Sequence, residues 1–207
     1  MVALTRRVRD EQGVSLVEVL VAMVLSLAVG GIATQAVVAN LQAQRRLTDQ
    51  THVLNGAKTA LERVTRDVRG ANPLTAAAPA AATVAIVDGG QRRTVSYWLC
   101  PPGALCALSG ATASGRQLAV QERTTDATTG AVISDSPARL LLDGIVMPSG
   151  TGIFRYFAAD GTELTGTLTA AQLPAVRSLT TRLRMPLAES SAAVDLENQI
   201  MLRNAGG

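Results

Sequence analysis

The sequence predicts an α+β protein: one long N-terminal helix, with a membrane half and an amphipathic half, packed on an antiparallel β-sheet head. Near the N-terminus, an uncharged apolar stretch leads into residues with apolar side chains at helical spacing. Further along, short alternating runs separated by turn signals are typical of strands. We therefore expect a leader over 1–13, a membrane helix over 14–39, an amphipathic helix over 40–72 and a β-rich head over 73–207.

The membrane half is predicted from length and charge. Residues 19–44 contain no charged side chain. A helix over 14–39 would be about 39 Å long at about 1.5 Å per residue, and a bilayer core is roughly 30 Å thick. Three arginines precede the segment (Arg6, Arg7 and Arg9). The positive-inside rule keeps them cytoplasmic, so the rest of the chain is expected on the other side.

Glu18 interrupts this apolar stretch, and the next basic residue along the chain is Arg45. A carboxylate in a bilayer costs about 2.5–3.5 kcal/mol, and such residues are usually functional and paired. Cleavage after Gly13 would supply a partner, because a new α-amine on Val14, with a pKa of about 7.7–8.0, would be protonated near neutral pH. Pairing within one helix or with a neighbouring chain would offset desolvation, and between chains it would set their register.

The segment Gly13-Val14-Ser15-Leu16-Val17-Glu18 lies between a short basic leader and a long apolar helix. It resembles the prepilin peptidase site of type IV pilins and type II secretion pseudopilins. The resemblance implies cleavage after Gly13, methylation of the new N-terminal residue Val14, and a role for Glu18 as the carboxylate that guides assembly. Val14 departs from the family pattern, in which Phe is most frequent at this position.

The helix is expected to continue to about residue 69 as an amphipathic segment. Its apolar stripe is formed by Leu47, Leu54, Ala57, Leu61, Val64 and Val68. The pairs Glu62–Arg66 and Arg63–Asp67 are four residues apart, and we place both pairs on the outer faces. A sheet is the expected partner of the stripe, and a two-helix coiled coil is the alternative. Gly30-Gly31 marks either a close helix contact or a weak point of the helix.

The head is predicted to be a set of short strands. Residues 74–82, rich in alanine, are expected to form a loop. Candidate strands are 83–87, 94–100, 117–124, 139–146, 153–158, 176–185 and 193–202, and Asp160-Gly161 is a predicted tight turn. Asp160 and Glu163 are also considered as Ca²⁺ ligands, but the turn explains them better. His52 is expected at the surface.

The end of the helix and two segments of the head also resemble PilW-like minor pilins and J-type pseudopilins. These segments are 62–69, 140–146 with the following aromatic strand and turn, and 200–204. The resemblance implies a subunit that sits at the tip of a filament or primes its assembly, rather than the bulk subunit.

Cys100 and Cys106 flank a short loop that contains two prolines. Outside the cytoplasm, two cysteines at this spacing indicate a disulfide. Two free thiols are the alternative. A metal site is not expected, because two ligands do not complete a tetrahedral site.

Composition argues against catalysis and nucleic-acid binding. The chain has 207 residues, a net charge of +3 and one histidine. Its charges are mixed beyond the N-terminus, without the basic stripe that nucleic acid requires. No catalytic motif is found, so we expect no enzyme activity and no cofactor.

The predicted function is a minor pilin or pseudopilin. Its expected partners are the prepilin peptidase and methylase and sister subunits. It is expected as a single-pass protein of the inner or cytoplasmic membrane with an extracytoplasmic head. A first alternative is a pilin-like module that captures an exported protein, DNA or a surface. A second is an exported domain on an ordinary signal peptide or anchor.

Overall fold

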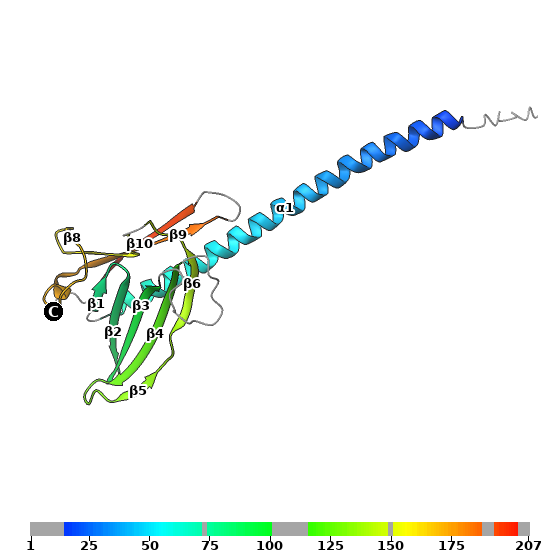
Figure 1. Ribbon diagram of the computed structural model, residues 1–207. Coiled ribbons are helices and arrows are strands. Elements are labelled where there is room, and N and C mark those ends of the chain that lie inside the picture. The colour runs from blue at the N-terminus through cyan, green and yellow to red at the C-terminus, as the bar shows by residue number, and fades with distance from the viewer. Residues whose placement is uncertain (1–14, 72–73, 101–115, 149–150, 188–192, 203–207) are drawn as a thin grey trace, which may run out of the picture. The chain divides into compact units, whose positions relative to one another are not determined.

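The computed structural model describes residues 15–71, 74–100, 116–148, 151–187 and 193–202. Helix α1 comprises 54 residues, Leu16–Arg69, and is followed by β-strands (Figure 1). The prediction of one long N-terminal helix followed by an antiparallel β head is confirmed. The chain divides into two compact units, Met1–Leu47 and Thr48–Gly207, so α1 contributes to both.

In the first unit, the described residues form only the N-terminal part of α1. Every residue from 15 to 47 is exposed within the chain. The most apolar 18 residues have a mean hydropathy of 2.4, and none of them is buried. By length and composition, this helix is suited to cross a membrane.

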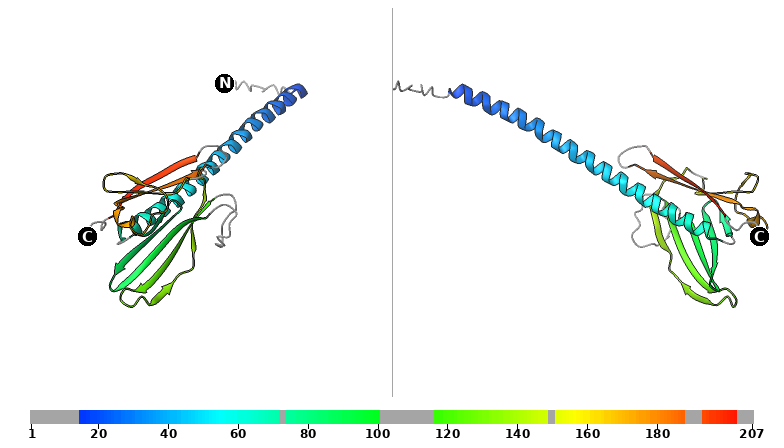
Figure 2. Two further views of the ribbon diagram at one scale, coloured as in Figure 1. Left: turned by 60° about the vertical axis from the view of Figure 1, so that its left-hand side comes forward. Right: turned by 180° about the vertical axis from the view of Figure 1, so that it is seen from behind.

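The second unit contains two antiparallel sheets (Figures 1 and 2). The six-stranded sheet has the order β1-β2-β3-β4-β5, and β6 also pairs with β4; the four-stranded sheet has the order β10-β9-β7-β8. The strands are β1 (Leu74–Ala78), β2 (Ala81–Asp88), β3 (Gln91–Cys100), β4 (Arg116–Asp126), β5 (Val132–Asp135), β6 (Arg139–Ile145), β7 (Phe154–Phe157), β8 (Glu163–Leu164), β9 (Ser178–Pro186) and β10 (Ala193–Met201).

The apolar stripe at the C-terminal end of α1 packs into the core of the head. Its buried apolar residues are Ala57, Ala60, Leu61, Val64 and Val68. They cluster with buried side chains of both sheets, among them Tyr97, Leu118, Phe154 and Leu179. The predicted stripe is wrong at its first member, because Leu47 is 64% exposed. The core of the head packs against the helix from Val53 onward, and Leu47 precedes that contact.

The prediction of a loop over residues 74–82 is also wrong. Residues 74–78 form β1, and β2 begins at Ala81. β1 pairs with β2 from Leu74↔Val84 to Ala78↔Ala81. Alanine has a low intrinsic strand propensity, but pairing and burial decide the conformation here. The sequence also did not indicate β5, β8 and the short 3₁₀ helix η1 (Leu173–Ala175).

The two sheets are joined by close backbone contacts. Phe154 N donates to Pro79 O at 3.0 Å, and Val146 N donates to Arg184 O at 2.8 Å. A Cβ on Gly152 would lie 2.3 Å from Pro79 O, so this approach requires glycine. The predicted turn at Asp160-Gly161 is present between β7 and β8, where Gly161 adopts a φ of +82°.

Candidate functional site

The first turn of α1 positions Glu18. The carbonyl of Ser15 accepts hydrogen bonds from the backbone N–H groups of Glu18 (2.9 Å) and Val19 (3.2 Å). Glu18 is the acidic residue of this first turn, and its side chain is exposed. A carboxylate near a helix N-terminus interacts favourably with the helix dipole. The fold therefore accommodates the charge locally and leaves both oxygens available to another molecule.

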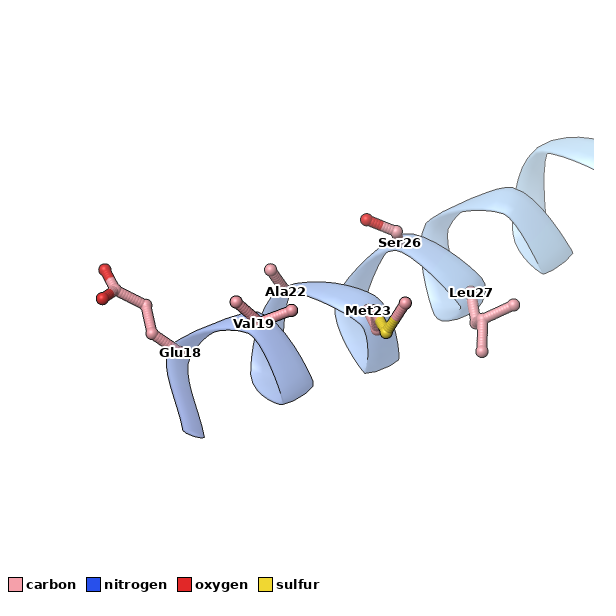
Figure 3. Close-up of a pocket in the computed structure, with 6 residues that line it drawn as sticks. All are labelled: Glu18, Val19, Ala22, Met23, Ser26 and Leu27. Atoms are coloured by element: carbon pink, nitrogen blue, oxygen red, sulfur yellow. The ribbon is translucent and has the colours of Figure 1, made fainter. Parts of the chain in front are cut away.

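A shallow hollow runs along the helix beside Glu18. It is lined by Glu18, Val19, Ala22, Met23, Ser26 and Leu27 (Figure 3). Glu18, Ala22 and Ser26 follow one another at intervals of four, so they share one face of the helix. Gly30 continues this row, and its carbonyl accepts a hydrogen bond from Thr34 Oγ1 at 2.8 Å. Small side chains on one face let the backbone of a second helix approach closely.

Glu18 has no cationic partner among the residues that the structure describes. The next basic residue, Arg45, is 27 positions further on, which is about 40 Å along a helix. The other predicted site residues, Gly13 and Val14, lie outside the described residues. The cationic partner predicted from the sequence would therefore lie before residue 15 or in another chain.

A second carboxylate of α1, Asp67, has its partners within the head. Asp67 Oδ1 accepts from Arg93 Nη2 at 3.0 Å, and Oδ2 accepts from the Tyr97 hydroxyl at 2.5 Å. Arg63 Nε lies 4.0 Å from Oδ2, and the Asp67 side chain is 2% exposed. The pair Arg63–Asp67 thus has the predicted spacing, but its placement on an outer face is wrong. Asp67 is buried because β3 supplies donors opposite it.

Glu122 of β4, which is half-buried, extends this cluster toward the surface. It accepts hydrogen bonds from Arg63, from Arg93 at 3.2 Å and from Arg139 at 2.9 Å. Burial, followed by the hydrogen bond to Asp67, raises the pKa of Tyr97 above its ordinary value, so the phenol remains a donor at neutral pH. Three strands and the helix end are held together by two carboxylates. Sequence spacing offered no signal for this, because Arg93 and Tyr97 are 26 and 30 residues from Asp67.

The remaining predicted residues lie in the head. Cys100 ends β3, is buried and is disulfide-bonded, whereas Cys106 lies outside the described residues. His52 is exposed. Asp160 Oδ1 accepts from the N–H of Thr162 at 2.9 Å, and Glu163 pairs with Arg155. These contacts account for both carboxylates within the hairpin. No group of three or more metal-ligating side chains occurs among the described residues.

Fold and site together define a class: an α+β head carried on a long N-terminal helix whose first half is apolar, exposed and interrupted by one carboxylate. Residues 8–34 match the family model of the prokaryotic N-terminal methylation motif. This motif is the leader of type IV pilins and pseudopilins, so the chain has a type IV pilin-like N-terminus. No curated protein and no solved structure matches the chain significantly.

Proposed function

We propose that the chain is a minor pilin or pseudopilin, a structural subunit that primes or caps an extracytoplasmic filament. The observation that carries the proposal is the exposed carboxylate of Glu18, which lies inside the methylation motif and has no partner among the described residues. The motif implies processing by a prepilin peptidase and assembly with other pilins. Proteins that carry it are structural rather than enzymatic.

Processing creates the cation that Glu18 requires. Cleavage between Gly13 and Val14 frees an α-amine, and methylation of Val14 leaves that amine basic. The amine of an incoming subunit meets Glu18 of its neighbour, and the small residues after Glu18 let the two helices approach closely. In this apolar environment the pair offsets the desolvation of both charges and fixes the axial position of one subunit against the next.

The same helix anchors the subunit before assembly. Its apolar half spans the inner or cytoplasmic membrane, with the leader arginines on the cytoplasmic side and the head outside. Residues 14–39 serve as the membrane and assembly segment, 40–72 as the amphipathic half and 73–207 as the head. The tip or priming position is supported by the resemblance of the helix end and two head segments to PilW-like minor pilins and J-type pseudopilins.

Replacement of Glu18 tests the proposal. The full chain is co-expressed with its peptidase and sister subunits, and the fraction in sheared filaments is compared with the fraction in membranes. We expect Glu18→Ala to lower incorporation by at least about tenfold, which corresponds to about 1.4 kcal/mol. Insertion into the membrane should not change, because the variant removes a charge from the apolar segment.

Glu62→Ala is the matched control. Glu62 is an exposed glutamate of the same helix, and it pairs with Lys58 at 3.9 Å on the surface of the head. This variant should be incorporated normally. Normal incorporation of Glu18→Ala would refute the proposed pairing, and equal defects in both variants would show that any lost glutamate on the helix disturbs assembly.

A further inference from the structure

The face of the larger sheet that points away from α1 carries an unusual set of side chains. Tyr97 points toward the helix, since its hydroxyl contacts Asp67. Side chains alternate along a strand, so Thr94, Ser96 and Trp98 of β3 lie on the opposite face. The cross-strand neighbours there are Thr83 of β2 beside Ser96, and Gln121 and Arg123 of β4 beside Ser96 and Thr94. This outer face is therefore polar and rich in hydroxyl groups.

A small polar hollow lies on this face. Its lining residues come from three adjacent strands and are Thr94, Ser96, Gln121, Arg123 and Asp135. Arg123 pairs with Asp135 at 3.1 Å, and Gln121 Nε2 donates to Asp135 Oδ1 at 3.3 Å. The hollow thus presents hydroxyl, amide, guanidinium and carboxylate groups with no net charge. We refer to these five residues as the outer-face hollow.

Trp98 follows the outer-face hollow along β3 and is not one of its lining residues. It is two residues from Ser96 on the same strand and face, which is about 6.6 Å along β3. Its cross-strand neighbours are Ala81 and Ala119, whose small side chains leave room for the indole beside them. The side chain is partly exposed, although Trp98 is the only tryptophan of a chain with 2% aromatic residues. A tryptophan beside a neutral polar hollow combines an apolar platform with hydrogen-bonding groups.

This combination matches the chemistry of a neutral sugar. The C–H face of a sugar ring packs on an aromatic ring, and its hydroxyl groups need both donors and acceptors at the edge. Asp135 supplies an acceptor, Arg123 and Gln121 supply donors, and the hydroxyls of Thr94 and Ser96 supply both. A nucleic acid or another polyanion fits less well, because Asp135 already neutralises Arg123 and would repel phosphate.

We propose that the outer-face hollow and Trp98 form a binding site for neutral hexose units of a polysaccharide chain. The site is distinct from the assembly segment, so it stands whether or not the chain enters a filament. The head would then bind a neutral polysaccharide, whereas the N-terminal segment contacts membrane and sister subunits. The strand register places all of its groups on one sheet face, where Arg123 and Asp135 are exposed and the other four residues are half-buried.

The single tryptophan makes the site directly measurable. The full chain is purified in a detergent without a sugar headgroup, and Trp98 emission is recorded while oligosaccharides of glucan, mannan and galactan are added. Heparin fragments and single-stranded DNA serve as anionic probes. We expect a saturable blue shift with at least one neutral oligosaccharide and none with the anionic probes. A response to no neutral oligosaccharide, or only to the anions, would overturn the proposal.

Two matched variants separate binding from folding. Asp135→Ala should weaken the response by about tenfold or more, because it removes the acceptor and frees Arg123. Asp195→Ala removes the partner of Arg182 in a similarly exposed pair, 3.2 Å apart, on the other sheet, and should bind normally. Both should melt at the temperature of the unmodified chain. Equal binding by the two variants would place the response of Trp98 outside the hollow and contradict the assignment.

Discussion

Two of the carboxylates of helix α1, Asp67 and Glu18, have opposite surroundings. Asp67, near its C-terminal end, is buried and contacts Arg93, Tyr97 and Arg63 of its own chain. Glu18, in the first turn, is exposed on an apolar helix and has no cationic partner among the described residues. The partners of Asp67 are therefore supplied by its own fold, whereas the described part of the chain supplies none for Glu18.

The same contrast holds for apolar surface. Around Asp67, the helix buries its alanine, leucine and valine side chains against two sheets. Around Glu18, large apolar side chains such as Leu16 (80% exposed) and Leu27 (77% exposed) have no cover within the chain. Exposed apolar surface of this extent marks a membrane or protein contact. Variants of the two regions should therefore fail in different ways: head variants in stability, and N-terminal variants in assembly.

The largest effect on stability is expected from Asp67→Ala. It leaves Arg63 and Arg93 without their buried partner and removes the acceptor of the Tyr97 hydroxyl. Breaking a buried pair of this kind costs about 3 kcal/mol, which lowers the melting temperature by roughly 6–12 °C in a chain of this size. Thermal unfolding of the full chain followed by circular dichroism would measure this loss.

Glu18→Ala and Glu62→Ala provide the contrast for that experiment. Both glutamates are exposed, so each replacement should change the free energy of unfolding by less than about 0.5 kcal/mol. If Glu18→Ala destabilised the head as much as Asp67→Ala, the distinction between the two carboxylates would be wrong.

A smaller loss is expected from the cysteines. We propose that disulfide-bonded Cys100 pairs with Cys106, which would tie the end of β3 to the segment that follows. Closing a loop of about seven residues contributes about 2 kcal/mol through the unfolded chain. Cys106→Ser should lose this stability in chemical denaturation, and Cys100→Ser and the double variant should lose at least as much, because Cys100 is buried. If Cys106→Ser had unchanged stability, the proposed Cys100–Cys106 disulfide would be wrong.

Tyr97→Phe is expected to cost less than the loss of Asp67 or of the disulfide, and its effect depends on pH. Loss of the hydroxyl, and of its hydrogen bond to Asp67, should cost about 1–2 kcal/mol at neutral pH. Burial raises the pKa of Tyr97 in the folded chain, so the unfolded chain releases this proton first. Stability supplied by the phenol is therefore present below about pH 10 and is lost as pH rises above it.

Denaturation from pH 8 to pH 11 would detect that dependence. The fall in stability above pH 10 should be less steep in Tyr97→Phe than in the unmodified chain. Tyr156 also has a pKa raised by burial, and its hydroxyl donates to Ala81 O at 2.9 Å, so Tyr156→Phe should flatten the same region of the profile. An unchanged slope in both variants would contradict the assigned burial.

Local patterns in the sequence predicted much of this fold. Apolar spacing predicted the helix, and alternation indicated most of the longer strands because each buries one face. It did not indicate β1, whose alanines resemble a flexible loop until β2 pairs with them. It also missed β5, where all four residues are exposed and alternation is absent.

The two carboxylates Glu18 and Asp67 also differ in how well the sequence predicted their surroundings. Glu18 was visible in the sequence, because one charge in a long apolar stretch is a local anomaly. Asp67 was placed on the wrong face, because its Arg63 neighbour at four residues looked like an ordinary surface pair. Its burial depends on Arg93 and Tyr97, which reach it only after the chain has folded into β3. Sequence spacing along a helix does not report partners contributed by a sheet.

The assignment of α1 as a processed assembly helix is tested most directly at its N-terminus. The full chain is produced in cells that contain a prepilin peptidase, extracted from membranes, and examined by intact mass and N-terminal sequencing. We predict a chain that begins at Val14 and carries one methyl group on its amine. A chain that begins at Met1, or one cut after the apolar stretch, would contradict the account and leave Glu18 without its proposed partner.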